Sequence, residues 1–262
     1  MEGIELKNVS FSYDNKTEFF KGLSFTLGKG ELVALIGPNG SGKSTFLKLS
    51  SGILSPREGE VNVSGNPISK YSPKKRAELV SYLPQIIDMD VSFTVRELAS
   101  MGQYHGKNSG LSIEEALSVT GLSDKALRKV FELSGGERRR AFLAMMLVQG
   151  AKTLLLDEPL TNLDIKYQLE LVNLVKKIVV MENSSAIVAI HDINLVRRFE
   201  KVCVMKGGKI KKTGSPNEVL TEDLIKEVFE VSPLDLYGQQ GLSPYNIFPA
   251  PRDPCKNPRE RL

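Results

Sequence analysis

The stretch Leu32-Val33-Ala34-Leu35-Ile36-Gly37-Pro38-Asn39-Gly40-Ser41-Gly42-Lys43-Ser44 joins a short apolar run to a glycine-rich loop. The loop has the pattern G-x-x-x-x-G-K-[ST], in which glycines let successive backbone N–H groups turn inward around phosphate oxygens. The apolar run before it and the helix-like sequence after it favour a strand–loop–helix unit, whose helix directs its positive end at the anion. A glycine turn with a surface lysine is the alternative reading.

This loop defines a first set of candidate binding residues. Lys43 would reach the β- and γ-phosphates of a nucleotide, and the Ser44 hydroxyl would take a place on Mg²⁺. The expected cofactors are therefore ATP and Mg²⁺. The candidate nucleotide-binding residues of the loop are Gly37, Pro38, Asn39, Gly40, Ser41, Gly42, Lys43, Ser44 and Thr45.

Composition sets limits on the class of protein. The chain has 262 residues, 41% hydrophobic and 25% charged, which is typical of an ordinary globular protein and argues against disorder. Its formal charge of +4 requires neither nucleic acid nor an acidic membrane as partner, and no nucleic acid is expected. The sequence shows no signal peptide and no apolar stretch near the length of a membrane helix. The few cysteines fit a reducing cytoplasm, with Cys203 buried in an apolar run.

Four short apolar runs each end at a glycine or a polar residue. Residues 32–36 lead into Gly37, 79–83 lead towards Gln85, 153–156 into Asp157 and 186–190 into His191. Continuous apolar runs are typical of parallel strands that helices cover on both faces. Because ligands bind beyond the carboxyl ends of such strands, the polar residues at these ends are expected to form one site.

The remaining sequence indicates how the chain is organised. Residues 4–25 have a strand-and-turn character, and residues 86–145 resemble a helical lobe, with short helices at 95–101 and 113–119. Two further strands are expected at 202–205 and 209–213, and a helix at 217–230. The predicted fold is α/β: a mainly parallel sheet, an N-terminal antiparallel β subdomain and an inserted helical subdomain. The predicted domain covers residues 1–235, followed by an irregular tail at 236–262.

Two adjacent carboxylates follow the third apolar run. Asp157 would hold Mg²⁺, and Glu158 would be the base that orients or deprotonates an attacking water. Adjacent carboxylates are more often a solvated acidic loop. Here the upstream phosphate loop and Pro159, which fixes the exit from the strand, favour the catalytic reading.

A second glycine pair lies at a helix start. Ser134 and Glu137 have the spacing of a capping box, which alone would explain them as a good helix start. The intervening Gly135 and Gly136 cost helix stability, and they make sense if a phosphate approaches the N–H groups closely. Since the loop at Gly37 already serves the chain's own nucleotide, the second anion site is assigned to the nucleotide of another subunit.

Together these motifs resemble the ABC-type ATPases, the nucleotide-binding subunits of ATP-binding-cassette transporters, over roughly residues 3–230. By that resemblance the fold is a P-loop NTPase core and the active form is a homodimer. Ser134 and Gly136 would contact the γ-phosphate across a head-to-tail dimer, with Gly135 and Glu137 beside them, and residues 162–164, including Asp164, would line the seam.

The resemblance also assigns roles to three further residues. Tyr13 would stack on the adenine, Gln85 would link Mg²⁺ and the attacking water to the membrane partner, and His191 would hold the γ-phosphate. Each residue also has a structural alternative. Tyr13 could be a core aromatic, Gln85 a cap of the strand end, and His191 an ordinary histidine. The implied catalytic residues are thus Glu158, His191 and Gln85, and the metal ligands Ser44, Gln85 and Asp157.

The chain departs from the family pattern at two positions. Leu160 stands where threonine is more frequent, and Glu137 replaces the more frequent glutamine. Neither change removes a group needed for phosphate chemistry.

A single cassette resembles the separate subunit of a bacterial importer, peripheral on the inner face of the cell membrane. Residues 93–98 and 101–105 are similar to the subgroup serving iron–siderophore, haem and cobalamin importers. This implies integral membrane permease subunits and a separate solute-binding protein. The alternatives are a zinc or manganese importer ATPase, a soluble ABC ATPase acting on nucleic acid, translation or cofactor assembly, and a regulator that does not turn over ATP.

Overall fold

The computed structural model describes residues 3–14, 16–85, 92–105 and 110–230. The chain divides into two compact units, residues 1–219 and 220–262. The predicted irregular tail at 236–262 lies outside the described residues. Among the described helices, none combines the length and the apolar character needed to cross a bilayer.

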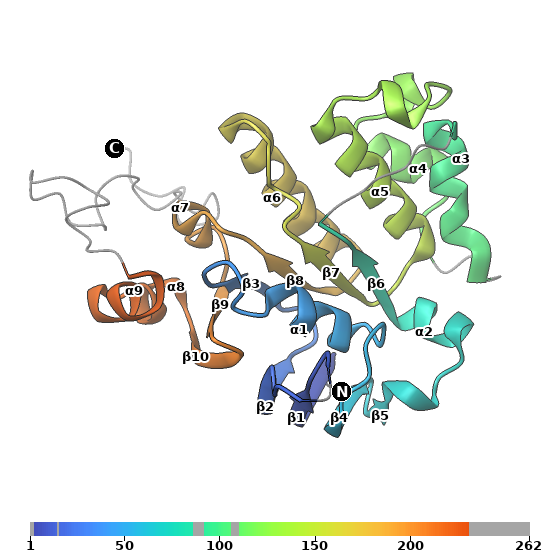
Figure 1. Ribbon diagram of the computed structural model, residues 1–262. Coiled ribbons are helices and arrows are strands. Elements are labelled where there is room, and N and C mark those ends of the chain that lie inside the picture. Colours follow the sequence, from blue (N-terminus) through green and yellow to red (C-terminus); the bar gives the residue numbers. More distant parts are fainter. Residues whose placement is uncertain (1–2, 15, 86–91, 106–109, 231–262) are drawn as a thin grey trace, which may run out of the picture. The chain divides into compact units, whose positions relative to one another are not determined.

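A six-stranded sheet forms the centre of the first unit (Figure 1). Strands β9, β3, β8, β7 and β6 run parallel, and β10 pairs antiparallel with β9 at the edge. Every residue of β3, β7 and β8 is buried, which confirms that the continuous apolar runs are strands covered on both faces. In sheet order the strands are β10 (Lys209–Gly214), β9 (Lys201–Lys206), β3 (Leu32–Ile36), β8 (Ser185–Ala189), β7 (Thr153–Asp157) and β6 (Val80–Leu83).

A second, antiparallel sheet has the strand order β2-β1-β4-β5. The sequence predicted its first two strands, β1 (Ile4–Phe11) and β2 (Phe20–Leu27). It did not predict β4 (Glu58–Val63) and β5 (Asn66–Pro67), which come after the phosphate loop. The first three residues of β4 are exposed and only the last three are buried, so half of this strand carries no apolar signal.

One hydrophobic core joins the two sheets through helix α1 (Lys43–Ser50). Phe46 of α1 is fully buried and packs edge-on against Phe25 of β2, with ring centroids 5.2 Å apart. The same cluster contains Leu155 of β7 and Ile187 of β8. Packing on both sides fixes α1, and therefore the loop that precedes its first turn.

Seven further α-helices are described in the first unit. They are α2 (Pro73–Leu79), α3 (Val95–Ser100), α4 (Ile113–Val119), α5 (Gly135–Gln149), α6 (Ile165–Met181), α7 (Ile193–Val196) and α8 (Pro216–Val219). Short 3₁₀ helices span Ile68–Lys70, Met101–His105, Ser123–Lys125 and Val130–Glu132.

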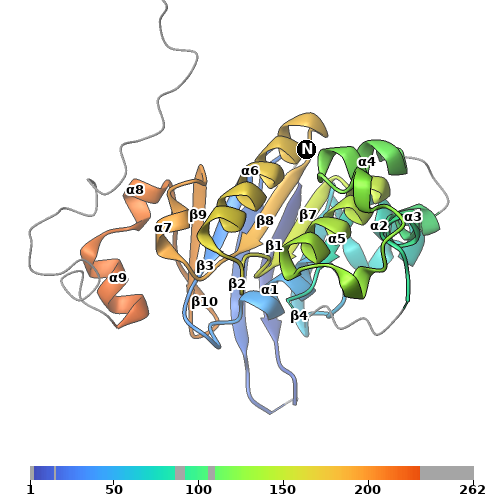
Figure 2. The same ribbon diagram turned by 90° about the horizontal axis from the view of Figure 1, so that it is seen from above.

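The predicted helical lobe lies between β6 and β7. These strands are neighbours in the sheet, so the chain leaves the sheet after β6, forms α3, α4 and α5, and returns at β7. Figure 2 shows the three helices gathered at that side of the molecule. Capping boxes start α3 at Thr94 and α4 at Ser112, and α5 runs to Gln149. The lobe is therefore an insertion whose two ends sit on adjacent strands.

The C-terminal elements differ from the prediction in one detail. The expected strands at 202–205 and 209–213 are confirmed as β9 and β10. The expected helix at 217–230 is two helices: α8 ends the first unit, and α9 (Glu222–Phe229) belongs to the second. The Thr221 hydroxyl accepts a hydrogen bond from the Leu224 N–H and so starts α9 as a new helix.

Candidate active site

The phosphate loop connects β3 to α1, as predicted, and its shape requires glycine. A Cβ at Gly37 would lie 2.2 Å from the Met205 carbonyl oxygen. Gly42 has φ 106°, and a Cβ there would lie 2.6 Å from the Phe20 ring. The Ser41 hydroxyl inside the loop is buried and has no hydrogen-bond partner among the described residues. A buried donor of this kind fits an incoming anion.

Lys43 is buried at the start of α1 and folds back over the loop. Its Nζ donates to the carbonyl oxygens of Gly37 at 2.9 Å and Pro38 at 3.3 Å, and lies 3.9 Å from the Glu158 carboxylate. Burial lowers the pKa of the Lys43 ammonium, and the carboxylates of Glu158 and Asp157 oppose that shift. Phosphate oxygens carry negative charge, so they would compensate this buried ammonium better than the neutral carbonyl oxygens of the loop do.

Asp157 ends β7 and is buried at 2% exposure. Its Oδ1 accepts a hydrogen bond from the Ser44 hydroxyl at 3.1 Å, and its Oδ2 accepts one from the Tyr82 hydroxyl at 3.0 Å. Burial raises the pKa of Asp157, while both hydrogen bonds oppose the rise. The sequence predicted the closeness of Asp157 and Ser44, but it did not single out Tyr82.

Tyr82 lies on β6, next to β7. Burial raises the pKa of its hydroxyl, and the negative charge of Asp157 raises it further, so the hydroxyl keeps its proton and donates. Tyr82 lies at Asp157 because β6 and β7 are neighbours in the sheet. The available signal was a tyrosine in the apolar run that precedes Gln85.

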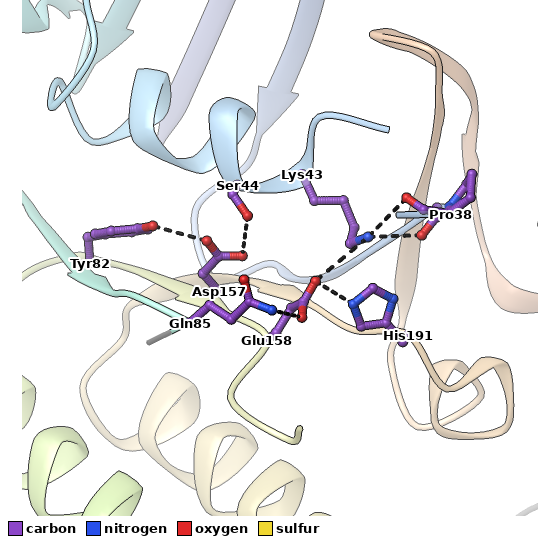
Figure 3. Close-up of polar contacts among 9 residues, drawn as sticks. Pro38, Lys43, Ser44, Tyr82, Gln85, Asp157, Glu158 and His191 are labelled. Carbon is purple, nitrogen blue, oxygen red and sulfur yellow. Dashed lines mark hydrogen bonds and ion pairs between the residues drawn. The ribbon is translucent and has the colours of Figure 1, made fainter. Parts of the chain in front are cut away.

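Glu158 connects three of the predicted residues (Figure 3). Its Oε2 accepts a hydrogen bond from Gln85 Nε2 at 2.5 Å. Its Oε1 contacts His191 Nε2 and lies 3.9 Å from Lys43 Nζ. Glu158 is 7% exposed and has φ 50°, in the left-handed region. The carboxyl ends of β6, β7 and β8 thus bring these groups together, as the ends of parallel strands should.

Tyr13 is an exposed aromatic beside the phosphate loop. Its hydroxyl lies 2.8 Å from the Thr45 hydroxyl, and its ring packs edge-on against Phe11 and Phe19. Its side chain is 62% exposed, so the ring is not a core aromatic. An exposed ring held next to the loop suits stacking on a base.

The glycine pair at the start of α5 lies on the surface. The Ser134 hydroxyl accepts from the Glu137 N–H at 3.3 Å, and Glu137 Oε2 accepts from the Ser134 N–H at 3.0 Å, which forms the predicted capping box. Among the described residues, the hydrogen bonds of Ser134 stay within the first turn of α5. A Cβ at Gly135 would meet nothing within 4 Å, whereas one at Gly136 would lie 3.3 Å from Leu163.

The two departures from the family pattern fit into the structure. Leu160 is buried within the loop between β7 and α6. Glu137 forms an ion pair with Lys125, and that pair, together with the Ser134 N–H, lowers the pKa of Glu137 to about 2. Asp164 is exposed at the N-cap position of α6, without a side-chain capping bond.

The pKa of Glu137 predicts a pH-dependent contribution to stability. A carboxyl with a lowered folded pKa stabilises the fold above its ordinary pKa of 4.5, and that stability is lost as the pH falls towards 2. Glu137→Gln should therefore lower the free energy of unfolding at pH 7 by on the order of 1 kcal/mol. The difference from the natural chain should shrink between pH 5 and pH 3, as measured by urea titration.

Glu58→Gln is the matched control, because it makes the same chemical change at an exposed position of β4. A Glu137→Gln difference that stays constant from pH 7 to pH 3 would contradict the assignment of an ionised pair with Lys125.

The chain is similar to known proteins of one family. The family model described as "ABC transporter" matches residues 20–161. The chain is 38% identical over 240 residues to the hemin import ATP-binding protein HmuV of Bradyrhizobium diazoefficiens, covering 87% of this chain and 88% of the relative. It is 36% identical over 240 residues to the iron(3+)-hydroxamate import ATP-binding protein FhuC of Bacillus subtilis, covering 88% and 89%. Among solved structures, the dimeric structure of MJ0796, a bacterial ABC transporter cassette, is similar with 26% identity and a TM-score of 0.73, covering 81% of this chain and 98% of that one. The chain therefore belongs to the ABC transporter family, as one of its nucleotide-binding, ATP-hydrolysing cassettes.

Proposed function

We propose that the chain is the ATPase subunit of an importer that moves a small solute, an iron complex, haem or cobalamin, through separate membrane permease subunits. The names of the relatives HmuV and FhuC, which concern hemin and iron(3+)-hydroxamate import, support this proposal. So does the similarity of residues 93–98 and 101–105 to that subgroup. The chain would then lie in the cytoplasm, peripheral on the inner face of the cell membrane, and a solute-binding protein would complete the system.

The observation that carries the ATPase part of the proposal is the set of contacts around Glu158. One buried carboxylate touches Gln85 and His191 and lies near Lys43, where the ends of β6, β7 and β8 and the phosphate loop meet. A water held against Glu158 would attack the γ-phosphorus of ATP while Glu158 accepts its proton. The bond between the γ-phosphorus and the bridging oxygen breaks, and ADP and phosphate leave.

We assign supporting roles to four further residues. Lys43 would exchange the carbonyl oxygens of Gly37 and Pro38 for the β- and γ-phosphate oxygens. His191 would hold the γ-phosphate, and Gln85 would keep the attacking water next to Glu158. Tyr13 would stack on the adenine beside the loop.

The donor set around Asp157 fits Mg²⁺. Ser44 offers a hydroxyl, Asp157 a carboxylate and Gln85 an amide oxygen, and Mg²⁺ is usually bound by one or two carboxylates together with substrate phosphates. When bound, the ion would neutralise charge on the phosphate oxygens.

Removing the proposed base is the first test. Glu158→Gln keeps the size of the side chain but cannot accept a proton, so the rate of ATP hydrolysis should fall by at least about 100-fold. ATP binding should persist, and the variant should collect as an ATP-bound dimer in analytical ultracentrifugation. Glu58→Gln is the control and should hydrolyse ATP at the natural rate. Normal turnover by Glu158→Gln would exclude Glu158 as the base.

We further propose that Ser134, Gly135 and Gly136 bind the nucleotide held by a second copy of the chain. Ser134 and Gly135 are exposed at the positive end of α5. Lys43 and the phosphate loop would already hold the nucleotide that binds to the same chain. The dimeric form of the related cassette MJ0796 supports a two-copy arrangement. Each active centre would then combine groups from two protomers, with Asp164 at the seam.

Gly135→Ala tests this arrangement with little disturbance to the monomer. The added Cβ meets nothing within 4 Å in one chain, so the free energy of unfolding and ATP binding by the monomer should stay near their natural values. If a partner's phosphate approaches this N–H closely, turnover should fall sharply, and Ser134→Arg should abolish it. Unchanged turnover in both variants, or equally weakened ATP binding in the isolated monomer, would contradict the trans-acting role.

The importer assignment has its own test. Purification of the full chain from detergent-solubilised native membranes should recover a polytopic membrane protein bound to it, and the complex should show ATPase activity that responds to the solute. Recovery with ribosomes or DNA instead, with loss of the association at high salt, would contradict an importer role and favour a soluble ATPase.

A further inference from the structure

Both oxygens of the Asp157 carboxylate accept a hydrogen bond, and they do so from different parts of the fold. Oδ1 accepts from Ser44 in the first turn of α1, and Oδ2 accepts from Tyr82 on β6 (Figure 3). Ser44 and Asp157 belong to the proposed nucleotide site. Tyr82 is not among the residues assigned to that site, and its hydroxyl reaches the site through the hydrogen bond to Asp157.

The sheet places the Tyr82 hydroxyl at Asp157. Tyr82 pairs with Leu155 in the parallel ladder of β6 and β7, and Asp157 follows Leu155 by two residues on the same face of β7. Two residues of strand span about 6.6 Å, which a tyrosine side chain leaning along the strand can cover. The Tyr82 ring is partly buried and packs against the hydrophobic core, so neither partner can turn away freely.

We propose that Tyr82 is a positioning residue, whose hydroxyl holds Oδ2 of Asp157 so that Oδ1 faces Ser44 and the metal–nucleotide. This inference rests on the proposed function of the site. When Ser44 turns from Asp157 to the metal, Tyr82 would be the remaining described donor to the carboxylate, and it would fix the plane of that group. Groups that orient a metal-binding carboxylate contribute about 10- to 100-fold to metal affinity.

A purely structural role makes a different prediction. Tyr82→Phe keeps the ring and its packing, so a structural tyrosine would lose only one hydrogen bond and some stability. A positioning tyrosine would change the dependence of nucleotide binding on Mg²⁺. The two roles therefore differ in a binding measurement that does not involve turnover.

The experiment is a Mg²⁺ titration of the full chain with a fluorescent, non-hydrolysable ATP analogue. Tyr82→Phe should raise the Mg²⁺ concentration for half-maximal binding by about tenfold, while the affinity for the analogue in EDTA should stay within about twofold. At saturating Mg²⁺ the rate of ATP hydrolysis should return towards that of the natural chain.

Tyr71→Phe is the matched control. Tyr71 is also partly buried against the core, and its hydroxyl donates to the Val63 carbonyl oxygen at 3.1 Å. This variant loses a hydroxyl and a hydrogen bond of the same kind away from Asp157, and its Mg²⁺ dependence should match that of the natural chain.

A double-mutant cycle asks whether Tyr82 acts through Asp157. In an Asp157→Asn background, adding Tyr82→Phe should change the Mg²⁺ dependence by less than twofold. An unchanged Mg²⁺ midpoint in Tyr82→Phe, or an equal loss of binding with and without Mg²⁺, would overturn the inference. Failure of the proposed function would show separately, because the natural chain would then lack Mg²⁺-dependent binding itself.

Discussion

Two adjacent carboxylates, Asp157 and Glu158, are buried side by side at the end of β7, and the rest of the site is arranged around them. Burying an ionised carboxylate costs several kcal/mol unless hydrogen bonds and opposite charge compensate it. Asp157 receives two hydroxyl donors, and Glu158 receives an amide donor, a histidine and a nearby ammonium. The donors come from the start of α1, from β6 and the residues after it, and from the segment after β8, so the charge can be buried only when these elements are in place.

The need to compensate buried charge also explains why a nucleotide would bind at this site. Lys43 contacts carbonyl oxygens of its own loop, and the Ser41 hydroxyl is buried without a partner among the described residues. Phosphate oxygens would satisfy both groups and would bring more negative charge towards Asp157 and Glu158. A cation bound at Ser44 and Asp157 would balance that charge, which gives a physical reason for nucleotide and metal to bind together.

The parts of the site that the sequence predicted are those that local rules determine. Glycine spacing placed the loop, and the apolar runs placed Gln85, Asp157 and His191 at strand ends that parallel pairing then brought together. The sequence did not predict Tyr82 as a site residue, because its role depends on which strand lies beside β7. Strand β4 was not predicted because its first half, Glu58, Gly59 and Glu60, is polar and exposed. The partner for Ser134 lies on another molecule in the proposed dimer, so a single chain places the residue but not its contact.

The backbone conformation of Glu158 is energetically unfavourable. A residue other than glycine at φ 50° is in a disfavoured region, and such conformations cost of order 1 kcal/mol or more. Selection for folding stability alone would place glycine or asparagine there. Thermostabilising redesign guided only by folding energy would therefore choose this position early, and with Glu158 as the proposed base it would exchange enzymatic turnover for heat resistance.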